Sequence, residues 1–159
     1  MNQPNSKSKL IRSAAWVAGS LLVIAALYLV VMNQMMARVN SDVPSDLDYS
    51  TTRTSDNDLF RVSYTSSPDI VPVNQMHQWT LHIETADGQP IEDAKISVDG
   101  DMPQHGHGLP TRPQVTKYLG NGDYLVEGMK FQMGGWWVMD FTISANGQTD
   151  AVRFNMMLK

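Results

Sequence analysis

The stretch that decides the fold is Trp136–Leu158, WWVMDFTISANGQTDAVRFNMML, in which apolar and polar residues alternate on both sides of an Asn-Gly pair. Alternation with a period of two is typical of a β-strand that buries one face. The dipeptide Asn146-Gly147 strongly favours a two-residue hairpin turn. The side chains expected to face the core are Trp137, Met139, Phe141 and Ile143 before the turn, and Val152, Phe154 and Met156 after it. The segment therefore predicts two antiparallel strands joined by a tight turn.

The same kind of pattern extends upstream to residue 59. Further strands are expected at Leu59–Tyr64, His77–Thr85, Ala94–Val98, Gln114–Leu119 and Tyr124–Glu127. Turn-forming residues separate these strands, and no segment among them has the period of an amphipathic helix. About seven short strands over roughly 100 residues predict an all-β fold, an immunoglobulin-like antiparallel β-sandwich at residues 59–159. Its core would be filled by Trp79, Trp137, Phe141 and Phe154.

An apolar segment near the N-terminus, Ala14–Met32, contains no charged residue and is long enough to cross a bilayer as a transmembrane helix. Basic residues precede it and all the acidic residues follow it, which predicts that residues 1–13 form a cytoplasmic tail. We therefore expect a single-pass anchor in the cytoplasmic membrane, with the C-terminal domain in the periplasm or outside the cell. A cleaved signal peptide is the alternative, but its apolar core is usually only about 7–15 residues long.

The segment between the anchor and the domain, residues 33–58, is rich in Ser, Thr, Asp and Asn and holds few apolar side chains. Such a segment buries too little surface to offset the entropy lost on ordering. It is therefore expected to be a flexible linker, of which a part could pack as a short edge segment.

Charge and composition exclude several classes of function. The first 38 residues hold four of the 12 basic side chains and none of the 16 acidic ones, so the remainder carries a net charge of −8. An acidic domain is a poor candidate for nucleic acid, whose binding requires Lys and Arg to neutralise phosphates. The chain has no cysteine, which excludes disulfides, thiolate metal sites and cysteine nucleophiles. No nucleophile elbow or phosphate-binding glycine loop is present, so an enzyme is not expected.

Two stretches interrupt the strand pattern. Met102–Pro113 (MPQHGHGLPTRP) holds two histidines, two glycines, three prolines and a methionine, and Gly128–Gly135 (GMKFQMGG) holds three glycines and two methionines. Proline removes backbone donors and glycine loosens the backbone, so the first stretch is predicted to be a loop and the second to be irregular. His105 and His107 are separated by one glycine. Imidazole accepts both oxidation states of copper, and thioether sulfur favours Cu(I). If the two stretches lie at the same end of the sandwich, a His/Met copper site could form there.

The same residues have a second interpretation in which no metal is bound. The histidines would then bond to backbone groups, and the methionines would fill gaps in the core, which is a common use of methionine. The first stretch would be a recognition or packing element of a protein-interaction or structural module of the cell envelope. A contact that responds to pH is a third alternative.

The order of residues in these stretches resembles that of the YtkA-like domain, a relative of the FixH family. The resemblance rests on the run MPQHGHG at 102–108, then Pro110-Thr111 and Pro113, the run from Leu119 to Tyr124, and the segment from Val126 to Trp137. It covers about residues 60–158 and is densest from Met102 to Trp137. The family run has proline where this chain has Gly134.

The resemblance implies a membrane-anchored or secreted β-sandwich domain on the outer side of the cytoplasmic membrane. It also implies copper handling or cytochrome oxidase assembly, with no reaction assigned to the domain. Carried over position by position, the expected metal-site residues are Met102, His105, His107, Met129 and Met133. The expected partners are the membrane, bound through Ala14–Met32, a copper ion and an envelope protein.

Overall fold

The computed structural model describes residues 23–33 and 43–159. Residues 23–33 form a helix with mostly exposed side chains, which belongs to a different compact unit from the β domain. Among the described residues, no helix combines the length and the apolar character that crossing a membrane requires. The predicted tail at residues 1–13 and the first part of the predicted anchor Ala14–Met32 lie outside the described residues, so both stay predictions.

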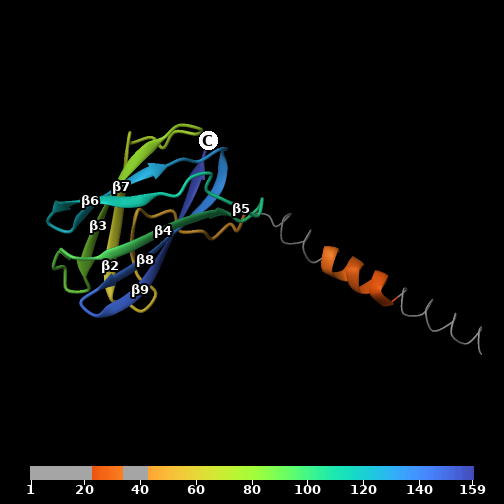
Figure 1. Ribbon diagram of the computed structural model, residues 1–159, viewed down its shortest axis with the longest axis horizontal. Coiled ribbons are helices and arrows are strands. Elements are labelled where there is room, and N and C mark those ends of the chain that lie inside the picture. Colours follow the sequence, from red (N-terminus) through yellow and green to blue (C-terminus); the bar gives the residue numbers. More distant parts are fainter. Residues whose placement is uncertain (1–22, 34–42) are drawn as a thin grey trace, which may run out of the picture. The chain divides into compact units, whose positions relative to one another are not determined.

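The β domain consists of two antiparallel sheets that share one core (Figure 1). The first sheet has the order β1-β2-β3-β7-β6 and contains β1 (Thr52–Thr54), β2 (Phe60–Ser67), β3 (His77–Thr85), β7 (Asp123–Met129) and β6 (Gln114–Gly120). The second has the order β5-β4-β8-β9 and contains β5 (His107–Gly108), β4 (Lys95–Met102), β8 (Gly135–Ala145) and β9 (Gln148–Leu158). The predicted antiparallel β-sandwich is confirmed, but the described residues form nine strands where about seven were expected. The two additional strands are β1 and β5.

The hairpin of β8 and β9 forms as its sequence predicts. Its register runs without a shift from Ala145 opposite Gln148 to Gly135 opposite Leu158. Asn146 and Gly147 both have positive φ angles, 54° and 74°, as a type I′ turn requires. Because side chains alternate between the two faces of a strand, this turn fixes which residues of both strands face the core.

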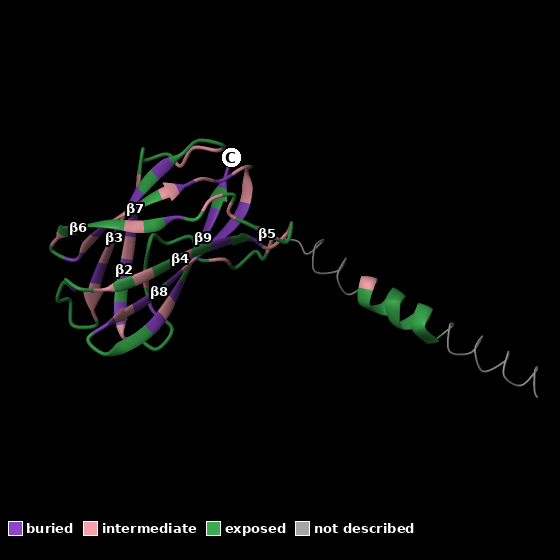
Figure 2. Cartoon of the chain, in the orientation of Figure 1, coloured by how far each residue is buried: buried purple, intermediate pink, exposed green. Residues whose placement is uncertain are grey.

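The core contains the aromatic residues that the alternation places inward. Buried residues alternate with more accessible ones along β2 and β3 (Figure 2). The four aromatic residues expected in the core are all 0 % exposed, namely Trp79, Trp137, Phe141 and Phe154. Tyr64 stacks on Trp79 with ring centroids 4.3 Å apart. Phe131, which precedes β8, is also fully buried and lies between Trp79 and Trp137, with ring centroids at 6.1 and 5.1 Å.

The chain before residue 59 is already part of the domain, so the part of residues 33–58 that was allowed to pack as a short edge segment includes β1. Strand β1 pairs with β2, and Ser55 is only 2 % exposed. Asn57 donates from its backbone and side-chain amides to the Asp150 carboxylate of β9, at 2.9 and 2.8 Å. Burial raises the pKa of Asp150, but hydrogen bonds from Ser55, Asn57 and the next backbone N–H outweigh it and hold the pKa well below its ordinary value. Composition indicated a linker because the segment is polar. In the structure, these polar groups form hydrogen bonds within the domain and so hold the segment in place.

A charged cluster joins β2, β3 and β7 on the outer face of the first sheet. His82 Nδ1 lies 2.6 Å from Asp123 Oδ1, and His82 Nε2 lies 3.2 Å from Glu84 Oε1. Arg61 of β2 lies 3.6 Å from the same Glu84. Partial burial lowers the pKa of His82, but the two carboxylates raise it more, so the pKa lies above its ordinary value.

We expect this cluster to stabilise the domain more at acidic than at alkaline pH. Since the pKa of His82 is higher in the folded than in the unfolded chain, its contribution is complete below about pH 6.5 and is lost as the pH rises through the folded-state pKa. Urea unfolding of the wild type and of His82→Gln should differ by roughly 0.2–1 kcal/mol at about pH 5.5, and by less at about pH 9. A difference that grows with pH would contradict this interpretation.

Candidate metal site

The histidine-rich stretch is a short β-hairpin rather than a simple loop. Met102 is the last residue of β4 and pairs with His107 in β5. The Met102 carbonyl accepts hydrogen bonds from the backbone N–H groups of His105 and Gly106, both at 2.9 Å. Gly106 has a φ of 62°, a conformation that glycine adopts without strain. The prediction that Met102–Pro113 is a loop is therefore wrong where β5 forms, because pairing with β4 overrides local composition.

The two glycine- and methionine-rich stretches lie side by side. Gln132 donates from Nε2 to His107 Nδ1 at 2.8 Å and to the Gly108 carbonyl at 3.3 Å. The His107 ring lies edge-on to Trp137, with centroids 6.1 Å apart. The indole Nε1 of Trp137 donates to the Met133 carbonyl at 3.1 Å. Both stretches therefore lie at one end of the sandwich, which the sequence analysis required for a shared site.

Gln132 determines which nitrogen of His107 is available. Because Gln132 Nε2 is a donor, His107 Nδ1 accepts and Nε2 carries the proton. Gln132 Oε1 is buried and has no hydrogen-bond partner among the described residues. A half-turn of the amide would let Oε1 accept from Nδ1–H and would free Nε2 for a metal ion, at the cost of the hydrogen bond to the Gly108 carbonyl. Histidines that bind metals are usually held in this way by an acceptor on the second nitrogen.

The two histidines of the hairpin are close enough to share one ion. Their rings are 25° from parallel, with centroids 5.8 Å apart. His105 is exposed and His107 is half-buried, so rotation of the His105 side chain meets little resistance. Within residues 23–33 and 43–159, no group of three or more His, Asp or Glu side chains could hold a metal ion. Methionine sulfur is the further side-chain ligand that the sequence predicts beside these two histidines.

The three methionines expected at the site differ in burial and position. Met102 and Met129 are 0 % exposed, whereas Met133 is 38 % exposed. Met102 is the cross-strand partner of His107, so both side chains lie on the inner face of their sheet. Met129 pairs with His77 across β3 and β7, beside a different histidine. The hairpin site thus contains His105, His107 and Met102, with Met133 following Gln132 directly.

The sequence did not reveal Gln132 or Trp137 as parts of this site. Trp137 was expected only in the core, and nothing distinguishes a glutamine that orients a histidine from any other glutamine. The spacing of Gln132 between Met129 and Met133 was visible, but only the hydrogen bond to His107 gives it a role.

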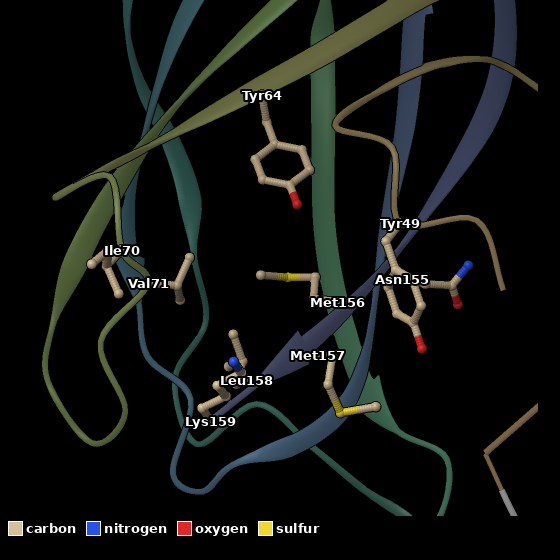
Figure 3. Close-up of a pocket in the computed structure, with 9 residues that line it drawn as sticks. All are labelled: Tyr49, Tyr64, Ile70, Val71, Asn155, Met156, Met157, Leu158 and Lys159. Carbon is tan, nitrogen blue, oxygen red and sulfur yellow. The ribbon is translucent and has the colours of Figure 1, made fainter. Parts of the chain in front are cut away.

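A separate apolar groove of about 420 Å³ lies between β9 and the segments around Tyr49 and Ile70 (Figure 3). Tyr49, Ile70 and Met157 on its rim are 44 %, 85 % and 45 % exposed. The groove is lined by Tyr49, Tyr64, Ile70, Val71, Asn155, Met156, Met157, Leu158 and Lys159. No histidine lines it, so it is distinct from the hairpin site.

The YtkA-like family profile matches residues 54–142, which is more than half of the chain. The chain belongs to the YtkA-like family. The match extends from β1 into β8, so both stretches of the candidate site lie within the YtkA-like region. No curated protein matches the sequence. Among solved structures, the ZirS C-terminal domain aligns with 15 % identity over 72 % of this chain and 81 % of that chain, with a TM-score of 0.37. This likeness is too distant to support an argument about function.

Proposed function

We propose that this YtkA-like protein is a membrane-anchored, extracytoplasmic accessory protein that handles copper or assists the assembly of a copper-containing oxidase. Its domain would be a β-sandwich of immunoglobulin-like type, tethered by Ala14–Met32. The observation that carries the proposal is the contact between Met102–Pro113 and Gly128–Gly135, in which Gln132 bonds to His107, whose ring lies beside that of His105. The uncharged apolar run near the N-terminus supports the tether.

The arrangement of ligands suits a protein that passes an ion on rather than one that keeps it. His105 and Met133 are exposed, so an ion bound by them and by His107 stays accessible to a partner. Imidazole and thioether ligands together favour Cu(I) over harder cations. Met102 is the buried cross-strand partner of His107, and its thioether would be a second sulfur ligand on the core side of the ion.

The proposal predicts that copper binding depends on the two hairpin histidines. The full chain in detergent should be titrated anaerobically with Cu(I) against a colorimetric Cu(I) chelator, and separately with Cu(II). We expect His105→Ala/His107→Ala to weaken the Cu(I) affinity of the hairpin by at least about 100-fold, and Gln132→Ala to weaken it by about 10–100-fold. His82→Ala, on the outer face of the first sheet, is the matched histidine control and should change nothing. A double variant that binds as many Cu(I) equivalents as the wild type, with the same affinities, would sink the proposal.

The apolar groove favours a second candidate function, a module that binds an extended segment of an envelope protein. The Ala151 carbonyl points away from β8 and accepts from Asp56 N–H, so Arg153, Asn155 and Met157 present their backbone groups to the same edge. At Asn155 the edge is met by the segment before β1, since the Asn155 side chain donates to the Asp48 carbonyl at 3.2 Å. No further backbone hydrogen bond to this edge is present in the part of the chain that the structure describes. An added strand would pair there and place apolar side chains in the groove. If no variant or wild type binds copper, this candidate becomes the better supported one.

A further inference from the structure

We propose that His77 and Met129 form a second site for Cu(I), inside the domain and separate from the His105/His107 hairpin. This site goes beyond the proposed function, because its ligands lie on β3 and β7 rather than on β4 and β5. It rests on an unpaired buried nitrogen, a buried methionine on the paired strand and a surface pocket beside His77.

The first observation is the state of the His77 side chain. His77 is 8 % exposed, and its Nδ1 lies 3.2 Å from the Gln75 carbonyl. A carbonyl only accepts, so Nδ1 carries the proton and Nε2 has a free lone pair. Nε2 is buried and has no hydrogen-bond partner among the described residues. A buried polar atom left unpaired costs about 1–3 kcal/mol, whereas a backbone carbonyl on Nδ1–H with a free Nε2 is the usual arrangement of a histidine that binds a metal.

The second observation is the residue opposite His77. Met129 is its cross-strand partner and is 0 % exposed. A β-bulge separates this pair from the next one, Trp79 and Val126. Both side chains are buried on the inner face of the sheet, where cross-strand partners are close enough to share a ligand. A thioether has no proton to donate and leaves Nε2 unpaired, but imidazole and thioether are both ligands of Cu(I).

The surroundings favour a soft monovalent ion and a neutral imidazole. The rings of Phe131 and Trp79 lie 5.6 and 6.4 Å from that of His77 and exclude water from the pair. Burial lowers the pKa of His77 more than the hydrogen bond to Gln75 raises it, so the ring stays neutral and able to bind at neutral pH. Harder cations prefer oxygen ligands and water, which this apolar site does not offer.

A surface pocket lies beside His77. It has a volume of about 450 Å³ and is also lined by Ser67, Met76, Gln78, Glu127 and Gly128. Met76 is 61 % exposed and adds a thioether to the chain segment that leads to His77. The Glu127 carboxylate in the same pocket attracts cations. The pocket therefore extends to His77, although Met129 does not line it.

The two metal sites are joined by one short segment. The segment runs from Met129, which pairs with His77, to Gln132, which bonds to His107. Between them, Phe131 contacts the rings of both His77 and Trp137, with centroids at 5.6 and 5.1 Å. Because the two sites share no ligand, removing one leaves the other to be measured.

The test counts Cu(I) equivalents in the full chain in detergent, under anaerobic conditions and with a colorimetric Cu(I) chelator as competitor. We expect two equivalents in the wild type and one in His105→Ala/His107→Ala. In that double variant, adding Met129→Leu should weaken the remaining equivalent by at least about 10-fold. Met139→Leu is the matched control, because Met139 is also 0 % exposed but pairs with Gly100 and Phe154 rather than with a histidine. It should leave the remaining equivalent unchanged.

A spectroscopic measurement removes the ambiguity of a variant that folds poorly. The ¹⁵N NMR signal of His77 Nε2 in the wild type should shift when Ag(I), a redox-inert substitute for Cu(I), is added. No shift at saturation would overturn the inference, as would a folded hairpin double variant that binds no Cu(I). Equal losses in the two leucine variants would also overturn it. None of these results tests the proposal that His105 and His107 bind Cu(I). That proposal is tested by whether the His105→Ala/His107→Ala variant loses one Cu(I) equivalent.

Discussion

Replacing Trp137 with alanine is expected to lower the free energy of unfolding by about 3–5 kcal/mol, as for other large buried aromatic side chains. Trp137 is 0 % exposed and lies against Phe131, with ring centroids 5.1 Å apart. The substitution leaves a cavity between the two sheets and removes the hydrogen bond from Nε1 to the Met133 carbonyl. It also removes the ring that supports His107. The loss should appear in urea unfolding followed by circular dichroism.

An exposed residue provides the control for this prediction. Leu119 is 47 % exposed on β6, and Leu119→Ala should change the unfolding free energy by no more than about 0.5 kcal/mol. Trp137→Phe separates the two roles of the indole, because it keeps an aromatic ring in the core but frees the Met133 carbonyl. We expect it to be intermediate in stability and to weaken Cu(I) binding at the hairpin. A loss of less than about 1 kcal/mol in Trp137→Ala would contradict the central place of this ring.

The parts of the fold that were predictable are those that local rules determine. The alternation in His77–Thr85 gave that strand with its observed bounds, and Asn146-Gly147 gave the type I′ turn and with it the register of β8 and β9. In both cases the sequence pattern and the tertiary environment favour the same conformation.

The elements that the sequence did not place depend on contacts between distant residues. Strand β1 is a polar segment whose conformation is set by pairing with β2, and the residues after it are fixed by Asp150, 93 positions further along. Strand β5 contains a glycine and forms because His107 pairs with Met102. No periodicity exists in two or three residues, so these elements carry no signal of their own.

The candidate site was predictable in its residue types but not in its grouping. The sequence singled out the histidines and methionines of two stretches as one set. The structure divides them, since Met129 faces His77 while His107 contacts Gln132. The strand register places each methionine opposite its histidine. The register between β3 and β7, which are neighbours in the sheet but far apart in sequence, cannot be read from local composition.

Gly122→Ala is expected to lower the free energy of unfolding by roughly 2–5 kcal/mol, through two separate effects. The φ angle of Gly122 is 80°, a conformation that strains any residue with a Cβ atom. A Cβ atom would also lie 2.6 Å from the backbone oxygen of Ile83, which cannot move without disturbing β3. The Gly122 carbonyl in turn accepts from the Ile83 N–H at 2.9 Å, so the clash acts on the contact that aligns β7 with β3.

Gly88→Ala isolates the first effect from the second. Gly88 has a φ of 81°, almost the same as Gly122, but a Cβ atom there would meet nothing within 4 Å. It should therefore lower stability by the conformational strain alone, about 1–2 kcal/mol. The difference between the losses of unfolding free energy in the two variants, measured by urea unfolding, gives the cost of the steric clash. If the two losses are equal, the turn at Gly122 relaxes enough to remove the clash. Because β7 carries Met129 to His77, a folded Gly122→Ala chain should also lose affinity for the inner Cu(I) equivalent, whereas Gly88→Ala should retain it.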